Sequence, residues 1–122
     1  MKNVSLQIEL QKINSILCVR VGGELDHHTA SQLKEQVEKE LDTNVIEHII
    51  LNLENLTFMD SSGLGVVLGR YKQIRDRGEM IVVNVPSSIS RLFEMSGLFK
   101  IIQVEKTENA ALEKLGVELS EK

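Results

Sequence analysis

The chain has 122 residues, of which 42% are apolar and 26% charged, close to the average of globular proteins. This length predicts one domain with its own core, and the composition excludes extensive disorder. The net charge of −4 and the aromatic content of 3% argue against a nucleic-acid-binding protein, which needs a basic surface and stacking side chains. The single cysteine, Cys18, cannot form an internal disulfide, and the apolar runs stay well short of the roughly 20 residues of a membrane helix. We therefore expect a cytoplasmic protein that neither binds nucleic acid nor inserts into a membrane.

The N-terminal third is expected to form two strands and a helix. Apolar and polar residues alternate over residues 4–10, the period of a half-buried strand. A second strand is predicted over residues 16–21 and ends at the pair Gly22-Gly23. Thr29 is expected to cap a helix that ends near residues 42–44. The apolar stripe of this helix recurs at steps of three or four residues and comprises Ala30, Leu33, Val37 and Leu41.

The middle of the chain repeats a strand–helix pattern. Residues 48–53 form a nearly continuous apolar run, which is typical of a strand covered by helices. A helix is predicted over residues 64–74 and is expected to stop at Gly78 in the left-handed conformation. Its predicted core stripe comprises Leu64, Val67, Leu68, Tyr71 and Ile74. A further strand is predicted over residues 80–85, just before Pro86.

The C-terminal part is expected to add two short helices and a weak strand. Ser87 or Ser88 is expected to cap a helix that ends at Gly97. The weak strand is predicted over residues 101–104. Thr107 is expected to cap the last helix, whose inner side comprises Ala111, Leu112 and Leu115.

The order of these elements predicts an α/β fold. Two strands followed by alternating helices and strands are typical of a mixed sheet with parallel βα units. We expect one domain over residues 1–122, with a sheet of about four to five strands and helices packed on it. Its ordered core is expected over residues 4–116, followed by a frayed tail over residues 117–122.

Residues 57–65, with the sequence TFMDSSGLG, are not explained by folding alone. They lie between a predicted strand and helix, at the sheet edge where open α/β folds gather functional groups. Asp60, Ser61 and Ser62 are all good capping residues, so a well-capped helix is one interpretation. The other is a phosphorylation site, because a phosphate at a helix N-terminus meets free amides and the positive end of the dipole. Phosphorylation of Ser61 or Ser62 would add about −1.5 to −2 charges beside Asp60.

Enzymatic interpretations of this segment are weaker. A nucleophile elbow has a glycine two residues before the serine, and neither Phe58 nor Met59 supplies it. A phosphate-binding loop would end in Gly-Lys-Ser/Thr, whereas Gly65 is followed by two valines. The adjacent pair His27-His28 is a poor metal chelate, because neighbouring residues on a helix point apart. We therefore expect neither an enzyme nor a metal site.

Three glycines follow the serines, at positions 63, 65 and 69. A glycine inside a helix costs about 1 kcal/mol relative to alanine, so each needs a reason. Gly65 and Gly69 are four residues apart and share a helix face. They indicate either tight packing of the helix on its own sheet or a smooth strip that another protein can approach closely.

Three segments resemble blocks of one known family. Residues 52–65, NLENLTFMDSSGLG, resemble the signature of the anti-sigma factor antagonists, which have the STAS fold. GELDHHTA at residues 23–30 and RLFEMSGL at residues 91–98 resemble two further blocks of that family. The resemblance covers residues 4–116 and implies a single STAS domain. Among the members, those that control sporulation-specific transcription are the most similar.

The resemblance implies a phosphorylation-switched binding protein. The unphosphorylated form is expected to bind an anti-sigma factor that is also a serine kinase, and thereby to release the sigma factor. Phosphorylation by that kinase, with ATP, then switches the antagonist off, and a dedicated serine phosphatase restores it. The family's phosphorylated serine directly follows the aspartate, which corresponds to Ser61 here, with Ser62 as the second choice.

The resemblance also implies a partner-binding surface. Asp26 matches an acidic position that contacts the kinase, although capping of the following helix would explain this aspartate equally well. The expected partner-binding set comprises Asp26, Asp60, Ser61, Ser62, Gly63, Gly65 and Gly69. No cofactor is expected. Because the family is associated with nucleotide binding, weak nucleotide binding is kept as a minor alternative, and a nucleotide- or small-ligand-binding STAS sensor is the alternative function.

Overall fold

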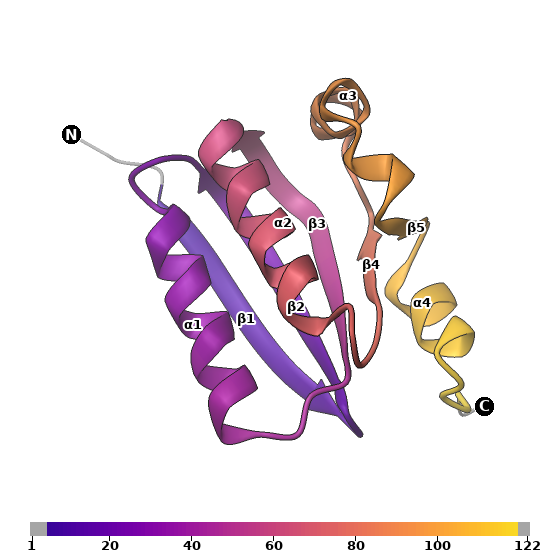
Figure 1. Ribbon diagram of the computed structural model, residues 1–122. Coiled ribbons are helices and arrows are strands. Elements are labelled where there is room, and N and C mark those ends of the chain that lie inside the picture. The colour runs from indigo at the N-terminus through magenta and orange to yellow at the C-terminus, as the bar shows by residue number, and fades with distance from the viewer. Residues whose placement is uncertain (1–4, 120–122) are drawn as a thin grey trace.

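A five-stranded mixed sheet lies at the centre of the computed structural model, which describes residues 5–119 (Figure 1). The strands lie side by side in chain order, and β1 is antiparallel to β2 while all other neighbours are parallel. They are β1 (Leu6–Ile13), β2 (Ile16–Leu25), β3 (His48–Met59), β4 (Met80–Val83) and β5 (Gln103–Glu105). The predicted α/β fold with a mixed sheet is confirmed.

Residues 5–119 also form four α-helices and one short 3₁₀-helix. They are α1 (Ala30–Thr43), α2 (Ser61–Ile74), α3 (Ser87–Ser96), η1 (Leu98–Lys100) and α4 (Glu108–Lys114), of which α4 follows the last strand. Helices α1 and α2 run side by side across one face of the sheet, and α3 lies at the end where β3 terminates (Figure 1). Among the described residues, no helix combines the length and the apolar character needed to cross a membrane.

The sheet separates two apolar clusters, because successive side chains of a strand point to opposite faces. Leu17 and Val19 of β2 pack in the larger cluster with α1, α2 and α3. Ile16 and Cys18 of the same strand pack in the smaller cluster with Ala111 of α4. The central strands are therefore buried on both faces, which explains their nearly continuous apolar sequences.

Strands β2 and β3 are both longer than predicted. Gly22 and Gly23 do not end β2, which continues to Leu25 through two register irregularities against β3. Gly23 has a φ of 88°, a left-handed conformation that glycine adopts without strain. Strand β3 continues beyond residue 53 to Met59, since Leu56 and Met59 remain buried. Residues 54–59, between the predicted strand and the predicted helix, are therefore part of β3.

Several predicted helix signals differ from the structure. Thr107 caps α4 as expected, accepting a hydrogen bond from the amide of Ala110 at 3.1 Å, and Gly97 ends α3 with a φ of 83°. In contrast, α3 begins after Pro86, and neither predicted serine makes a capping hydrogen bond. Gly78 is not left-handed, so that prediction was wrong. It is instead required by close packing, since a Cβ there would lie 1.7 Å from the carbonyl oxygen of Glu47.

The predicted core face of α2 is rotated in the structure. Val67 and Ile74 are buried as expected, but the other predicted members of the stripe, Leu64, Leu68 and Tyr71, are only half-buried. Val66 and Arg70 are buried instead. The reason is that α2 packs against α1 as well as the sheet, and Arg70 points at Glu38 of α1, with an Nη2–Oε2 distance of 3.2 Å.

The described part of the C-terminal segment contacts α4 and the smaller cluster. Val117 donates its amide to the carbonyl of Leu112 at 2.9 Å. The side chains of Val117 and Leu119 pack on the smaller cluster. Residues 117–119 therefore pack against the domain, while the expected fraying of the tail stays a prediction. Residues 120–122 lie outside the described residues, as does Val4 at the start of the first predicted strand.

Candidate functional site

The carboxyl ends of β2 and β3 bring two loops together. Leu25 and Met59 pair as neighbours in the parallel sheet, and the amide of Asp60 donates to the carbonyl of Leu25 at 3.3 Å. Asp26 and Asp60, the residues that follow these partners, therefore lie at the same edge, although 34 positions separate them in the sequence. We call residues 26–29 and 60–63 together the β2–β3 edge.

Asp60 is the N-cap of α2, which begins at Ser61 rather than at the predicted Leu64. Its carboxylate Oδ1 accepts hydrogen bonds from the amides of Ser62 at 2.9 Å and Gly63 at 3.3 Å. These are two of the amides that a helix N-terminus leaves without an intrahelical partner. From the sequence, a phosphate was expected to meet free amides here. This part of the prediction is wrong for Ser62 and Gly63, because both amides already donate to Asp60.

The two serines differ in accessibility. Ser61, the first residue of α2, is exposed, whereas Ser62 is half-buried. A kinase needs the hydroxyl group at the surface. The geometry therefore favours Ser61 over Ser62, a distinction that sequence spacing left open.

The three glycines have different surroundings. A Cβ on Gly63 would lie 2.7 Å from Met59 Cγ and 2.9 Å from the carbonyl oxygen of Leu25, so Gly63 is required by tight packing. A Cβ on Gly65 or Gly69 would meet nothing within 4 Å. Tight packing on the sheet therefore explains Gly63 alone. Gly65 and Gly69 follow Ser61 at steps of four, which extends one open strip along α2.

Asp26 shapes the loop before α1. Its Oδ1 accepts hydrogen bonds from the amides of His28 at 2.9 Å and Thr29 at 3.2 Å, and these bonds hold the pKa of its carboxyl below the usual value. Thr29, the predicted cap, instead donates its hydroxyl to the carbonyl of Glu24 at 2.8 Å. Asp26 thus stabilises the turn that leads into α1, whose N-cap position is Thr29, and the charge of Asp26 remains at the edge with that of Asp60.

The histidine pair lies in an exposed loop, as expected, but its side chains do not point apart. The ring centroids of His27 and His28 are 4.0 Å apart. His27 Nδ1 lies 3.9 Å from Asp60 Oδ2, and His28 Nδ1 lies 3.9 Å from Asp26 Oδ1. Within residues 5–119, no group of three or more potential metal ligands forms. Sequence reasoning missed the approach of His27 to Asp60, because it depends on the pairing of β2 with β3.

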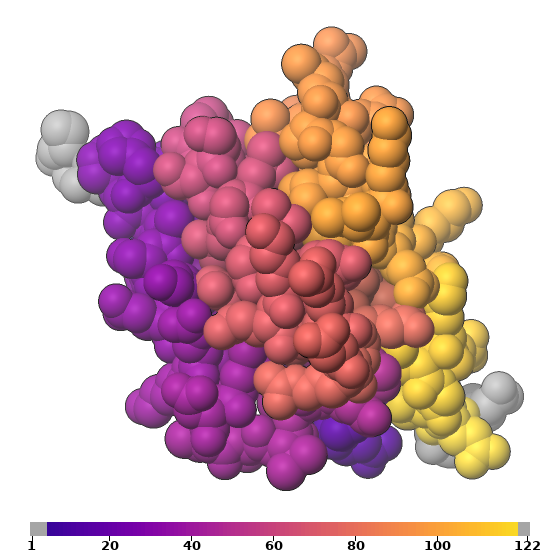
Figure 2. Space-filling model, in the orientation of Figure 1, coloured from indigo at the N-terminus to yellow at the C-terminus, as the bar shows by residue number. Residues whose placement is uncertain are grey.

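A second feature missed from the sequence is an apolar groove between β3 and α3, with a volume of about 290 Å³. Phe58 and Met95 line it, and 45% and 78% of their surfaces are exposed. Helix α3 (orange) projects at the end of the molecule where α2 begins (Figure 2). In the sequence, the signal that could have indicated this groove was the large apolar residue Phe58, directly before Met59 and Asp60.

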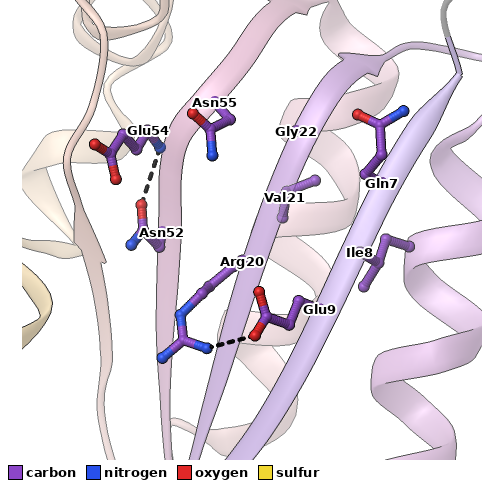
Figure 3. Close-up of a pocket in the computed structure, with 9 residues that line it drawn as sticks. All are labelled: Gln7, Ile8, Glu9, Arg20, Val21, Gly22, Asn52, Glu54 and Asn55. Carbon is purple, nitrogen blue, oxygen red and sulfur yellow. Dashed lines mark hydrogen bonds and ion pairs between the residues drawn. The ribbon is translucent and has the colours of Figure 1, made fainter.

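A polar hollow lies elsewhere, on the sheet face away from α1 and α2 (Figure 3). Strands β1, β2 and β3 form this hollow of about 420 Å³. Among the described residues that line it, Arg20 alone is cationic, and its guanidinium already donates to Glu9, Gln11 and Glu108. Glu9 and Glu54 add negative charge. The hollow therefore does not suit the phosphates of a nucleotide, and the nucleotide-binding alternative is not favoured.

Comparisons with known proteins agree with the resemblance found in the sequence. A family model described as STAS domain matches residues 7–111. The anti-sigma F factor antagonist of Paenibacillus polymyxa is 49% identical over 115 residues, which cover 93% of this chain and 98% of that protein. The structure of the anti-sigma factor antagonist SpoIIAA in its unphosphorylated form has a TM-score of 0.79 and 30% identity, covering 93% of this chain and 100% of that one. The Bacillus cell fate determinant SpoIIAA in the phosphorylated form has a TM-score of 0.72 and 32% identity, covering 89% and 99%.

Proposed function

The chain belongs to the STAS-domain family of anti-sigma factor antagonists, and on this premise we propose that it is a sporulation regulator switched by phosphorylation of Ser61. Unphosphorylated, it binds an anti-sigma factor that is also a serine kinase, and so releases the sigma factor for sporulation-specific transcription. Phosphorylation ends this binding, and a serine phosphatase restores it. The proposal places the protein in the cytoplasm and gives it no catalytic activity of its own.

The observation that carries this proposal is the position of Ser61. Its side chain is exposed at the start of α2, while the amides of Ser62 and Gly63 are already bonded to Asp60. A phosphoryl group on Ser61 therefore adds charge at the surface without requiring a new helix cap. The similarity of this fold to SpoIIAA in both the unphosphorylated and the phosphorylated form supports a local effect.

The partner is proposed to bind the β2–β3 edge together with the open strip of α2. Asp26 and Asp60 supply negative charge at this edge, and Gly65 and Gly69 let a partner approach the helix backbone. A partner that fits close to Ser61 leaves no room for a phosphoryl group. Binding would also have to transfer the phosphoryl group, with its charge of about −1.5 to −2, out of water, which is costly without paired cations.

The test uses the anti-sigma F factor kinase and ATP. Mass spectrometry is expected to find one phosphoryl group on the parent chain and on Ser62→Ala, but none on Ser61→Ala. Calorimetry is expected to show that Ser61→Ala binds the kinase like the unphosphorylated parent, whereas Ser61→Glu binds at least about tenfold more weakly, the equivalent of about 1.4 kcal/mol. Unchanged phosphorylation of Ser61→Ala would refute the assignment of the serine, and parental affinity of Ser61→Glu would refute the charge mechanism.

A further inference from the structure

His27 lies within the β2–β3 edge but has no individual role in the function proposed above, although it faces the residue that precedes Ser61. We propose that the imidazole of His27 is the counter-charge for the phosphoryl group on Ser61 and holds that group at the β2–β3 edge. This inference rests on the proposed phosphorylation of Ser61. It makes His27 a positioning residue of the phosphorylated state.

The first step is geometric. Asp60 uses Oδ1 to cap α2, which leaves Oδ2 directed toward His27 Nδ1 at 3.9 Å. This distance exceeds that of a hydrogen bond, so the ring is near the carboxylate without being fixed by it. The side chain of His27 is 68% exposed and therefore has space to turn. Ser61 directly follows Asp60, and consecutive Cα atoms lie about 3.8 Å apart. The phosphoryl group is therefore attached to the neighbour of the residue whose carboxylate faces His27.

The second step concerns hydrogen-bond donors. A phosphate at a helix N-terminus ordinarily binds the free amides of the first turn. In α2 the amides of Ser62 and Gly63 are already donated to Asp60. These two amides are therefore not available to a phosphoryl group on Ser61, and in the proposed arrangement the imidazole of His27 on the facing loop supplies a donor.

The third step concerns charge. The two segments that meet here, residues 24–29 and 57–63, contain the carboxylates Glu24, Asp26 and Asp60 and no lysine or arginine. His27 and His28 are the only groups of these segments that can become cationic. His28 faces Asp26 at 3.9 Å, and its ring lies 4.0 Å from that of His27, whereas His27 itself faces Asp60. Outside these two segments, Arg91 of α3 lines the groove beside Phe58 and Met59. Within the two segments, the cation best placed for the phosphoryl group is His27.

Phosphoserine loses its second proton near pH 6, so the charge of the phosphoryl group changes within an accessible pH range. Attraction between an imidazolium and a phosphoryl group on the order of 5 Å apart in water changes this pKa by about half a unit. The second pKa of the phosphoserine falls, because the imidazolium favours the more negative form of the phosphoryl group.

The test installs phosphoserine at position 61 during translation of the full chain, so it does not depend on any kinase. The ³¹P chemical shift is followed during a pH titration of the phosphorylated parent, His27→Gln and His28→Gln. His27→Gln is expected to raise the second phosphoserine pKa by about half a unit, and His28→Gln by less than half of that.

Two results would overturn the inference. One is a phosphoserine pKa in His27→Gln equal to that of the parent, and the other is an equal or larger effect of His28→Gln. His27 is an exposed loop residue, so its replacement is expected to leave the amide spectrum of the sheet unchanged. Failure of the kinase to modify Ser61 would refute the proposed function but would leave this titration result standing, so the two failures are distinguishable.

Discussion

Gly63 of α2 lies so close to Leu25 of β2 that an added Cβ would stand 2.9 Å from both the carbonyl oxygen and the Cγ atom of Leu25. This contact fixes the first turn of α2 against the end of β2. The exposed side chain of Ser61 is therefore presented from a rigid base rather than from a free loop.

We expect Gly63→Ala to lower the free energy of unfolding by about 1–3 kcal/mol, the usual range for overpacking a buried position. Gly65→Ala is the matched control in the same helix, because its Cβ would meet nothing within 4 Å. It is expected to be neutral or to stabilise the protein by up to about 1 kcal/mol, since alanine favours the helix. Urea unfolding measures both. Equal stability of the two variants would contradict the packing assigned to Gly63.

Asp60 is expected to contribute to stability as the cap of α2. Asp60→Ala removes the acceptor for the amides of Ser62 and Gly63 and should lower the free energy of unfolding by about 0.5–2 kcal/mol. Asp60→Asn keeps an oxygen acceptor and should lose much less. Urea unfolding of both variants is the measurement, with the exposed Asp76→Ala as control. A loss in Asp60→Asn as large as in Asp60→Ala would show that charge, rather than capping, is what stabilises the helix.

The elements that follow from local pattern were predictable from the sequence. The apolar run of β3, the cap at Thr107 and the helix end at Gly97 each depend on a few neighbouring residues, and all three occur as predicted. The resemblance at residues 52–65 identified the family because it covers strand, cap and helix start together.

What could not be predicted depends on contacts between distant segments. Gly78 looked like a helix stop, but it is small because Glu47 approaches it from the loop before β3. Arg70 is buried because Glu38 of α1 lies opposite, and His27 reaches Asp60 only because β2 pairs with β3. One sequence contains these residues but not the pairings that bring them together.

The ion pair between Arg20 and Glu108 predicts a pH dependence of stability. Arg20 donates to both carboxylate oxygens of Glu108, with distances of 2.6 and 2.9 Å, and joins β2 to the first residue of α4. These hydrogen bonds lower the pKa of Glu108 from its usual value of 4.5. A lowered folded-state pKa means that the stabilisation is fully present above pH 4.5 and is lost as the pH falls through the folded-state value.

Glu108→Gln should therefore cost about 1–3 kcal/mol at neutral pH, as expected for hydrogen bonds to a charged group. The difference from the parent should shrink as the pH is lowered below 4.5. Urea unfolding at several pH values measures it, and Glu113→Gln on the exposed side of α4 is the control. A difference that stays constant down to about pH 2.5 would contradict the linkage.

Cys18 is expected to be inert in the folded protein. It is fully buried between β2 and α4, and burial raises the pKa of its thiol to about 11. Because the thiolate is the reactive form, iodoacetamide at about pH 8 should leave the native protein unmodified and should alkylate it fully in urea. Mass spectrometry counts the added groups. Labelling of the native protein at the rate of the unfolded chain would contradict this burial.

Asp26 allows the structural and the partner-binding roles of one carboxylate to be separated. Asp26→Asn keeps an acceptor for the amides of His28 and Thr29 but removes the charge, whereas Asp26→Ala removes both. If the charge contacts the partner, both variants should bind the anti-sigma kinase about tenfold more weakly, while only Asp26→Ala loses about 1 kcal/mol of stability.

Calorimetry and urea unfolding of the same two preparations test this expectation, and Asp42→Asn, at the far end of α1, is the control for a general loss of negative charge. Parental affinity of Asp26→Asn combined with weak binding of Asp26→Ala would assign Asp26 to the shape of the loop alone. The negative charge that the β2–β3 edge offers to a partner would then come from Asp60, which caps α2 with Oδ1 and leaves Oδ2 outside the cap.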